Sequence, residues 1–356
     1  MSADPPAAAV AHGSSADRPS GRLRPGAALA VGSTLLAGAV TALPLLFSAR
    51  FYYLDDTQNQ GMGSMHLIGR LIRSGELTSV MSQLGAGGNL AVDPQYGLFF
   101  PPKLAMSVFV SLFDDVNLAA ILIMGFFNLV LCLGVALLLR HAGAGTLLAL
   151  AAAGSIATSG FLFVWGTNWQ PSLWSYALLP WLWLCLERRN TAISIAGVAL
   201  ITWLIVGFAF PFATVAAAGL CLAWFLARLL ARREPFLALL PKALAAAGGA
   251  LVGAIAYLPL AASIDWTVRQ SVVTNSGTLV PNLTELLLSS SPVSSSEIYF
   301  WGGQVAGSPI MYLGWFLLPI VALVDWRAVR WRSTLLPTAV VFSVVILLLT
   351  QLPSDF

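Results

Sequence analysis

Residues 116–139 read VNLAAILIMGFFNLVLCLGVALLL and contain no charged side chain. A helix needs about 20 mostly apolar residues to cross the hydrocarbon core of a bilayer, so this stretch predicts a membrane-spanning helix. The rest of the chain has the same character, because 58% of its 356 residues are hydrophobic and only 9% are charged. In soluble proteins roughly a quarter of the residues are charged. The sequence therefore predicts an all-α polytopic membrane protein, folded as a transmembrane helical bundle.

Other stretches meet the same criterion of length and hydropathy. Together they predict about nine spans, which lie at residues 27–48, 116–139, 145–165, 172–186, 192–209, 211–227, 240–262, 309–324 and 334–351.

The basic residues indicate how these spans are oriented. If the N-terminus is cytoplasmic, most of the 18 lysines and arginines fall in short inside loops, as the positive-inside rule requires. This orientation predicts a disordered cytoplasmic tail over residues 1–26, a transmembrane domain over 27–356, and long outer loops at about 49–115 and 263–308. Because the basic residues are scattered at span ends and form no patch, the composition speaks against a nucleic-acid partner.

The first outer loop holds most of the polar groups that can carry chemistry. Between Met62 and Ile72, methionines and isoleucines recur at spacings of three and four, which predicts an amphipathic interfacial helix over 61–74. Gly69 weakens this prediction, since glycine is a poor helix former. Residues 104–113 are apolar but too short to span, so they predict a second interfacial or re-entrant piece.

Tryptophans are frequent near the ends of the predicted spans, and Trp174 is one of them. This placement is typical of the aromatic belt at a membrane–water interface. Trp301, in the second outer loop, is in addition a candidate for stacking against a sugar ring.

Two adjacent acids, Asp55 and Asp56, follow the first span closely, which places both carboxylates near the outer boundary of the bilayer. On an extended segment they point to opposite sides, so that one can face a reacting centre while the other binds a metal ion or a structural partner. A carboxylate at a low-dielectric boundary has a raised pKa, which suits a general base acting on a hydroxyl. The alternative is that both are solvated acids or cap the helix 61–74.

The motifs Asp55-Asp56-Thr57-Gln58, Gly87-Gly88-Asn89 and Pro94-Gln95-Tyr96-Gly97-Leu98-Phe99-Phe100-Pro101 carry a resemblance to a known family. Together with the long first outer loop, they resemble the GT-C superfamily of polytopic membrane glycosyltransferases, and more particularly the YfhO-like bacterial membrane proteins. The resemblance covers roughly residues 27–215.

The resemblance implies a bacterial plasma membrane protein with a catalytic pocket on the outer face. The implied reaction moves a sugar from a polyprenyl-phosphate donor to a cell-envelope glycan, lipid or polymer. The family's first-loop acid corresponds to Asp55 or Asp56 as general base. The phosphate of the donor needs a cation, for which Arg50, Lys103 and Arg269 qualify by position. Each of these three is equally explained as a residue that snorkels to the interface.

Further polar residues complete the implied substrate site. Gln58, Gln95 and Tyr96 offer hydrogen-bonding groups suited to sugar hydroxyls, and Asp93 is either a second acid or a turn residue before its proline. A divalent metal ion, held by Asp55 or Asp56, is left open as a cofactor. His66 is a further candidate metal ligand or proton carrier, although a histidine without partners at ligand spacing is usually neither.

Two other functions stay open at this point. A transporter or flippase of lipid-linked glycans needs a substrate path lined by polar residues within the spans. A non-catalytic membrane assembly protein needs only outer loops that bind a partner. The chain also ends directly after its last predicted span, where GT-C proteins often continue, so it is expected to be a shortened member or a fragment.

Overall fold

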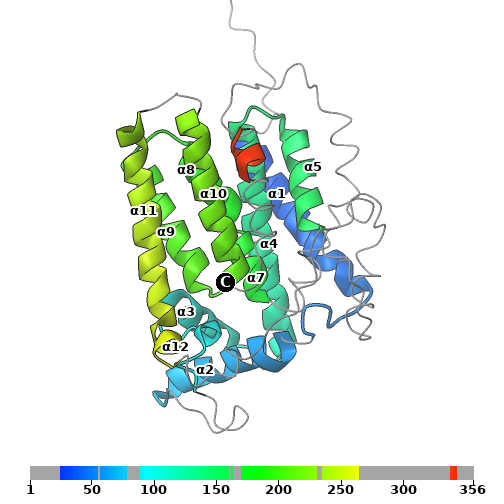
Figure 1. Ribbon diagram of the computed structural model, residues 1–356. Helices are drawn as coiled ribbons and strands as arrows, with labels where there is room; N and C mark the ends of the chain where they lie inside the picture. The colour runs from blue at the N-terminus through cyan, green and yellow to red at the C-terminus, as the bar shows by residue number, and fades with distance from the viewer. Residues whose placement is uncertain are drawn as a thin grey trace, which may run out of the picture.

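The computed structural model describes residues 25–54, 57–77, 89–159, 162, 170–230, 235–263 and 337–342. This part of the chain is built from helices and the turns between them, with no strand. The predicted all-α fold is therefore confirmed for these residues (Figure 1).

The principal helices, in chain order, are α1 (Pro25–Ala42), α2 (Gly63–Ser74), α3 (Pro101–Val110), α4 (Val116–His141), α5 (Thr146–Ala157), α7 (Gln170–Tyr176), α8 (Leu179–Glu187), α9 (Ala192–Gly207), α10 (Pro211–Leu230), α11 (Phe236–Ala254) and α12 (Leu258–Ala262). Shorter helical turns are η1 (Leu43–Leu46), η2 (Thr57–Met62), η3 (Pro94–Tyr96) and η4 (Ile255–Tyr257). Residues 337–342 are also helical.

Four of the described helical stretches are long and apolar enough to cross a membrane: Gly26–Leu46, Val116–His141, Ala213–Leu230 and Phe236–Ala262. They correspond to four of the predicted spans. Two shorter apolar helices, Thr146–Ala157 and Ala192–Gly207, lie within two more of the predicted spans. Of the last two predicted spans, 309–324 lies outside the described residues and 334–351 is described only at 337–342.

The predicted span 172–186 is not one helix. It is divided between α7 and α8, with turn residues at Ala177 and Leu178. Pro180 lies in the first turn of α8 and has no amide hydrogen, so it cannot donate to the carbonyl of Tyr176 as a continuous helix would require. The proline therefore explains why the first helix ends where it does.

The helices pack side by side as a bundle. In Figure 1, α1, α4 and α5 lie together on one side and α8, α9, α10 and α11 on the other. The two sides are joined where the indole Nε1 of Trp181 donates to the carbonyl of Val130 at 2.8 Å. Helices α9 and α11 approach closely at Gly249, where a Cβ would lie 2.2 Å from the carbonyl oxygen of Ala199. Small residues at such crossings are typical of helices packed in membranes.

The two ends of the bundle differ in their side chains and in their architecture. Arg140 lies in the last turn of α4, Arg188 and Arg189 follow α8, and Arg228 lies in the last turn of α10, so these arginines gather at one end, the upper end in Figure 1. We call this the basic end. It has the residue distribution that the positive-inside rule expects of a cytoplasmic boundary. The short helices α2, α3 and α12 lie at the opposite end.

Helices α2 and α3 lie against one another, in the region where the sequence predicts interfacial pieces. The apolar face of α2 is buried at Met65 and Ile68, as its spacing predicts. Gly69 is required by the packing, because a Cβ there would lie 2.0 Å from the carbonyl oxygen of Ser107 in α3. Arg73 of α2 donates from Nη1 to the carbonyl of Ser111 at 3.0 Å, which ties the far ends of the two helices together.

Candidate functional site

The candidate site is a polar cluster, partly buried, at the end of the bundle that carries α2, α3 and α12. We call it the Lys103 cluster, and define it by Lys103, Asp93, Gln95, Gln170 and Trp174. Its members come from α3, from the loop before α3, and from α7.

Lys103 lies in α3, whose start is determined locally. Phe100 is extended, and Pro101 and Pro102 occupy the first helical positions, where a missing N–H has no consequence. The Phe100 ring is buried and makes edge contacts with Trp203 at 5.3 Å and with Phe208 at 5.2 Å between centroids. This aromatic anchor holds the first turn of α3 against the end of α9.

The side chain of Lys103 is only 2% exposed. Its Nζ donates to the backbone carbonyl of Gln95 and lies 5.6 Å from the centroid of the Trp174 ring, within the range of a cation–π interaction. Burial lowers the pKa of Lys103 to about 8, and the nearby carboxylate of Asp93 opposes this shift. The site thus holds a cation in a low-dielectric environment, where its field is weakly screened.

The loop Asp93–Gly97 is folded over the stem of this lysine. One carboxylate oxygen of Asp93 accepts a hydrogen bond from the backbone N–H of Gln95 at 2.8 Å, so Asp93 acts as a turn residue. Gly97 has φ 69°, and a Cβ there would lie 2.5 Å from Cδ of Lys103. The residue must therefore be glycine both for its backbone conformation and for the space. Burial, and then the charge of Asp93, raise the pKa of Tyr96 in the same loop.

Helix α7 places two buried side chains one turn apart, Gln170 and Trp174, each 1% exposed. The Nε2 of Gln170 donates to the carbonyl of Tyr52 at 3.1 Å. Tyr52 follows α1, and its hydroxyl donates to the carbonyl of Val40 at 3.3 Å. The chain after the first span is thereby held against the helix that contacts Lys103.

Two buried oxygens near this connection have no hydrogen-bond partner within the part of the chain that the structure describes. They are Oε1 of Gln170 and Oγ1 of Thr57, and both residues are 1% exposed. An unpaired buried polar atom costs free energy, and in native proteins it often marks a place where a ligand or water binds. Thr57 directly follows Asp55 and Asp56 in the sequence.

The structure brings together only some of the residues that the sequence predicts for the site. Asp93, Gln95, Tyr96 and Lys103 lie in one loop and the helix that follows it. Arg50 and Gln58 are exposed. The residues Asp55, Asp56, Arg269 and Trp301 lie outside the described residues, so their predicted roles stay predictions.

The sequence did not single out two central members of the site. Trp174 was predicted to belong to an interfacial belt, and this is wrong, because its ring is buried against Phe127 and Phe208. Gln170 was not among the predicted site residues. Gln170 lies one turn before Trp174 at the start of an apolar segment, and this spacing is the only hint that the sequence offers. It does not tell which side of the helix faces the core.

No group of three or more His, Cys, Asp or Glu side chains suited to a metal ion occurs among the described residues. His66 is half-buried in α2, and its Nδ1 has no hydrogen-bond partner in the described ranges. The described residues therefore offer no ready metal centre for the cluster.

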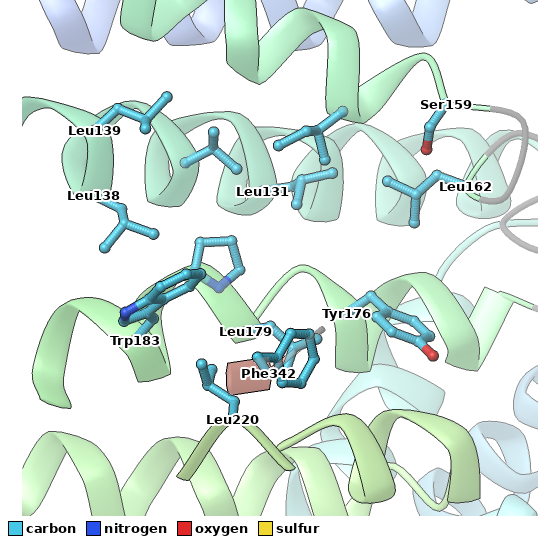
Figure 2. Close-up of a pocket in the computed structure, with 13 residues that line it drawn as sticks. Leu131, Leu138, Leu139, Ser159, Leu162, Tyr176, Leu179, Trp183, Leu220 and Phe342 are labelled. Atoms are coloured by element: carbon cyan, nitrogen blue, oxygen red, sulfur yellow. The ribbon is translucent and has the colours of Figure 1, made fainter. Parts of the chain in front are cut away.

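A second feature, an apolar pocket of about 400 Å³, lies deeper among α4, α5, α7, α8 and α10 (Figure 2). In Figure 2 the hydroxyls of Ser159 and Tyr176 lie on the right side of the pocket, and Trp183 lies on the left side. The rest of the wall is aliphatic or aromatic, and Phe342 contributes from the last described helical turn. Because Tyr176 shares α7 with Trp174, one short helix borders both the Lys103 cluster and this pocket.

Comparison of the chain with protein-family models, with curated proteins and with solved structures finds no match.

Proposed function

We propose that this chain is a GT-C-like membrane glycosyltransferase of about nine spans, with its N-terminus in the cytoplasm of a bacterium and its active site on the outer face. The donor is a polyprenyl-phosphate sugar, and the acceptor is a cell-envelope glycan, lipid or polymer. The observation that carries the proposal is the buried cation of Lys103, which lies beside Trp174 of α7. The same helix holds the segment around Tyr52 through the hydrogen bond from Gln170. That segment leads directly into Asp55 and Asp56.

In the proposed reaction, Asp55 or Asp56 removes the proton of an acceptor hydroxyl. The hydroxyl oxygen then attacks the anomeric carbon of the donor sugar, and the bond from that carbon to the phosphate oxygen breaks. Polyprenyl phosphate leaves with the bonding electron pair. A general base of this kind contributes roughly 10²-fold to 10⁴-fold to a reaction rate.

The negative charge that develops on the leaving phosphate requires cations nearby. Arg50 is exposed, and in this proposal it contacts the phosphate of the donor. Lys103 is enclosed, so in this proposal it acts through its field and by ordering the loop that carries Asp93, Gln95 and Tyr96. Arg269 stays a third candidate.

The apolar pocket of Figure 2 supports a lipid-linked substrate in preference to a polar solute. A transporter of sugars or glycans needs polar groups along its path through the spans, whereas this pocket offers two hydroxyls in an otherwise apolar wall. It has the lining that an isoprenoid chain requires.

The experiment uses the full chain in proteoliposomes, with radiolabelled polyprenyl-phosphate mannose, glucose and arabinose as donors and a bacterial envelope fraction as acceptor. At least one donor should be consumed by the unaltered protein, and Asp55→Asn or Asp56→Asn should reduce that transfer at least a hundredfold. Asp114→Asn is the control, because Asp114 is an exposed acid at the same end of the bundle. Full activity in both single variants, or no transfer from any of the donors, refutes the proposal.

A further inference from the structure

A second buried lysine lies at the opposite, basic end of the bundle, in a place that the proposed reaction does not use. Lys242 in α11 is 1% exposed, and its Nζ donates to the carbonyls of Leu186, at 2.7 Å, and of Arg188. These carbonyls belong to the end of α8. The lysine therefore places a positive charge where the partial negative charge of the helix C-terminus favours it.

The ring of Trp224 in α10 is contacted by two cations. The Nζ of Lys242 lies 5.4 Å from its centroid, and Cζ of Arg228 lies 5.3 Å from it. Arg228 also forms a 3.0 Å ion pair with Glu187, whose side chain is buried. The described charged side chains around Trp224 are thus two cations and one carboxylate, and the exposed Arg188 and Arg189 lie close by in the chain.

A pocket of about 210 Å³ opens beside this group, between α8, α10 and α11. Lys242 and Trp224 both line it, together with six other residues: Leu186, Cys221, Leu222, Phe225, Ala243 and Ala246. The indole Nε1 of Trp224 has no acceptor among the described residues, although the residue is only 3% exposed. A donor that is buried and unpaired, in the wall of a pocket that also contains a cation, indicates an anionic ligand.

The remainder of the wall indicates that this ligand also carries a hydrocarbon chain. Apart from Lys242 and Trp224 it is aliphatic or aromatic, with one cysteine. Leu222 is 49% exposed and belongs to the outer surface of a helix that is long and apolar enough to span the membrane. A small soluble anion has no apolar surface to bury against such a wall, whereas a lipid acyl chain is stabilised by burying its apolar surface there.

We propose that the pocket between α8, α10 and α11 binds an anionic phospholipid, with its phosphate at Lys242 and Trp224 and part of an acyl chain along Leu222, Phe225 and Ala246. Basic pockets between spanning helices at a cytoplasmic boundary bind anionic lipid head groups in other membrane proteins. The site is independent of the proposed glycosyl transfer, because it lies at the other end of the bundle.

The test measures lipid retention by native mass spectrometry on the purified full chain in detergent, with equal amounts of phosphatidylglycerol and phosphatidylcholine. The unaltered protein should retain phosphatidylglycerol preferentially. Trp224→Phe keeps an aromatic ring but removes the N–H, and it should weaken this preference about tenfold to a hundredfold, as expected for one hydrogen bond to a charged group. Ala246→Leu fills the pocket and should weaken it at least as much.

Two controls make the result decisive. Ala247→Leu adds the same atoms at the next position of α11, which is exposed and does not line the pocket, and it should leave the preference unchanged. Inorganic phosphate alone should not raise the unfolding temperature of the protein, whereas phosphatidylglycerol should. The site is overturned if Trp224→Phe and Ala246→Leu retain phosphatidylglycerol as well as the unaltered protein does. It is also overturned if Ala247→Leu loses as much of the preference as Ala246→Leu. Equal stabilisation by inorganic phosphate overturns the assignment to a lipid.

Discussion

The ammonium group of Lys103 lies 5.6 Å from the ring centroid of Trp174, and both side chains are almost completely buried. The first residue belongs to the short helix α3 and the second to α7 within the bundle. Their contact joins the polar first loop to the apolar scaffold, so the loop is part of the folded core and not a separate surface element.

Lys103 should make the stability of the protein depend on pH above about pH 8. Its pKa falls from 10.5 to about 8 on folding because the charged form loses hydration. Between these two values the unfolded chain keeps the proton that the folded protein has lost, so the free energy of unfolding rises with pH and then levels off. The rise is on the order of 3 kcal/mol.

The measurement is the unfolding temperature in detergent from pH 7.5 to pH 11. Lys103→Met removes the titrating group and should flatten the pH dependence relative to the unaltered protein, while other titrations affect both proteins equally. The same slope in both would show that Lys103 is not the group responsible.

Gly97→Ala should destabilise the protein by two effects together. A positive φ at alanine costs about 1 kcal/mol, and the added Cβ would lie 2.5 Å from the stem of Lys103. Gly75→Ala is the matched control, since Gly75 has a similar φ of 73° but a Cβ added there would meet nothing within 4 Å. Urea unfolding should show a loss for Gly97→Ala that exceeds that for Gly75→Ala by about 1 to 3 kcal/mol. Equal losses would mean that the loop does not close over Lys103.

Gly69→Ala should separate α2 from α3. A Cβ at this position would lie 2.0 Å from the backbone carbonyl of Ser107, and backbone cannot move aside as a flexible side chain can. Hydrogen exchange of the amides in α2 should therefore become faster. Gly38→Ala, in α1, is the control, because a Cβ added there would meet nothing within 4 Å and alanine is the better helix former. Unchanged exchange in α2 would contradict the packing described above.

Gln170→Leu should release the segment after the first span. The variant removes the hydrogen bond to the carbonyl of Tyr52 and leaves that buried acceptor unpaired, at a cost of about 1 to 3 kcal/mol. Amide exchange at residues 50–54 should become faster, and glycosyl transfer should fall if the segment positions Asp55 and Asp56. Gln58→Leu, at an exposed position in η2, should have little effect on exchange. If amide exchange at residues 50–54 is the same in both variants, the bond to Tyr52 does not hold the segment.

Much of the scaffold could be predicted from local composition. The four described helices that can span a membrane coincide with predicted spans, and α2 and α3 occur where interfacial pieces were expected. The details that composition did not predict come from local chemistry that hydropathy does not measure. Pro180 divides one predicted span into α7 and α8, and Gly69, which weakened the helix prediction, is the residue that lets α3 approach.

Only one half of the candidate site could be predicted from the sequence. Asp93, Gln95, Tyr96 and Lys103 are close in the sequence, so a local motif could group them. Gln170 and Trp174 belong to a helix that is distant in the sequence, and no spacing in the chain predicts their contact with the loop and α3.

The sequence by itself determined that this chain forms apolar helices able to cross a membrane, because the cost of placing charges and unpaired backbone groups in hydrocarbon acts on each segment separately. Only the tertiary structure decided which side chains of those helices meet. A helix that is apolar all round has no face that its sequence marks as inner, so its rotation is determined by packing. For that reason the burial of Lys103 beside Trp174, and of Lys242 beside Trp224, could be seen only in the folded protein.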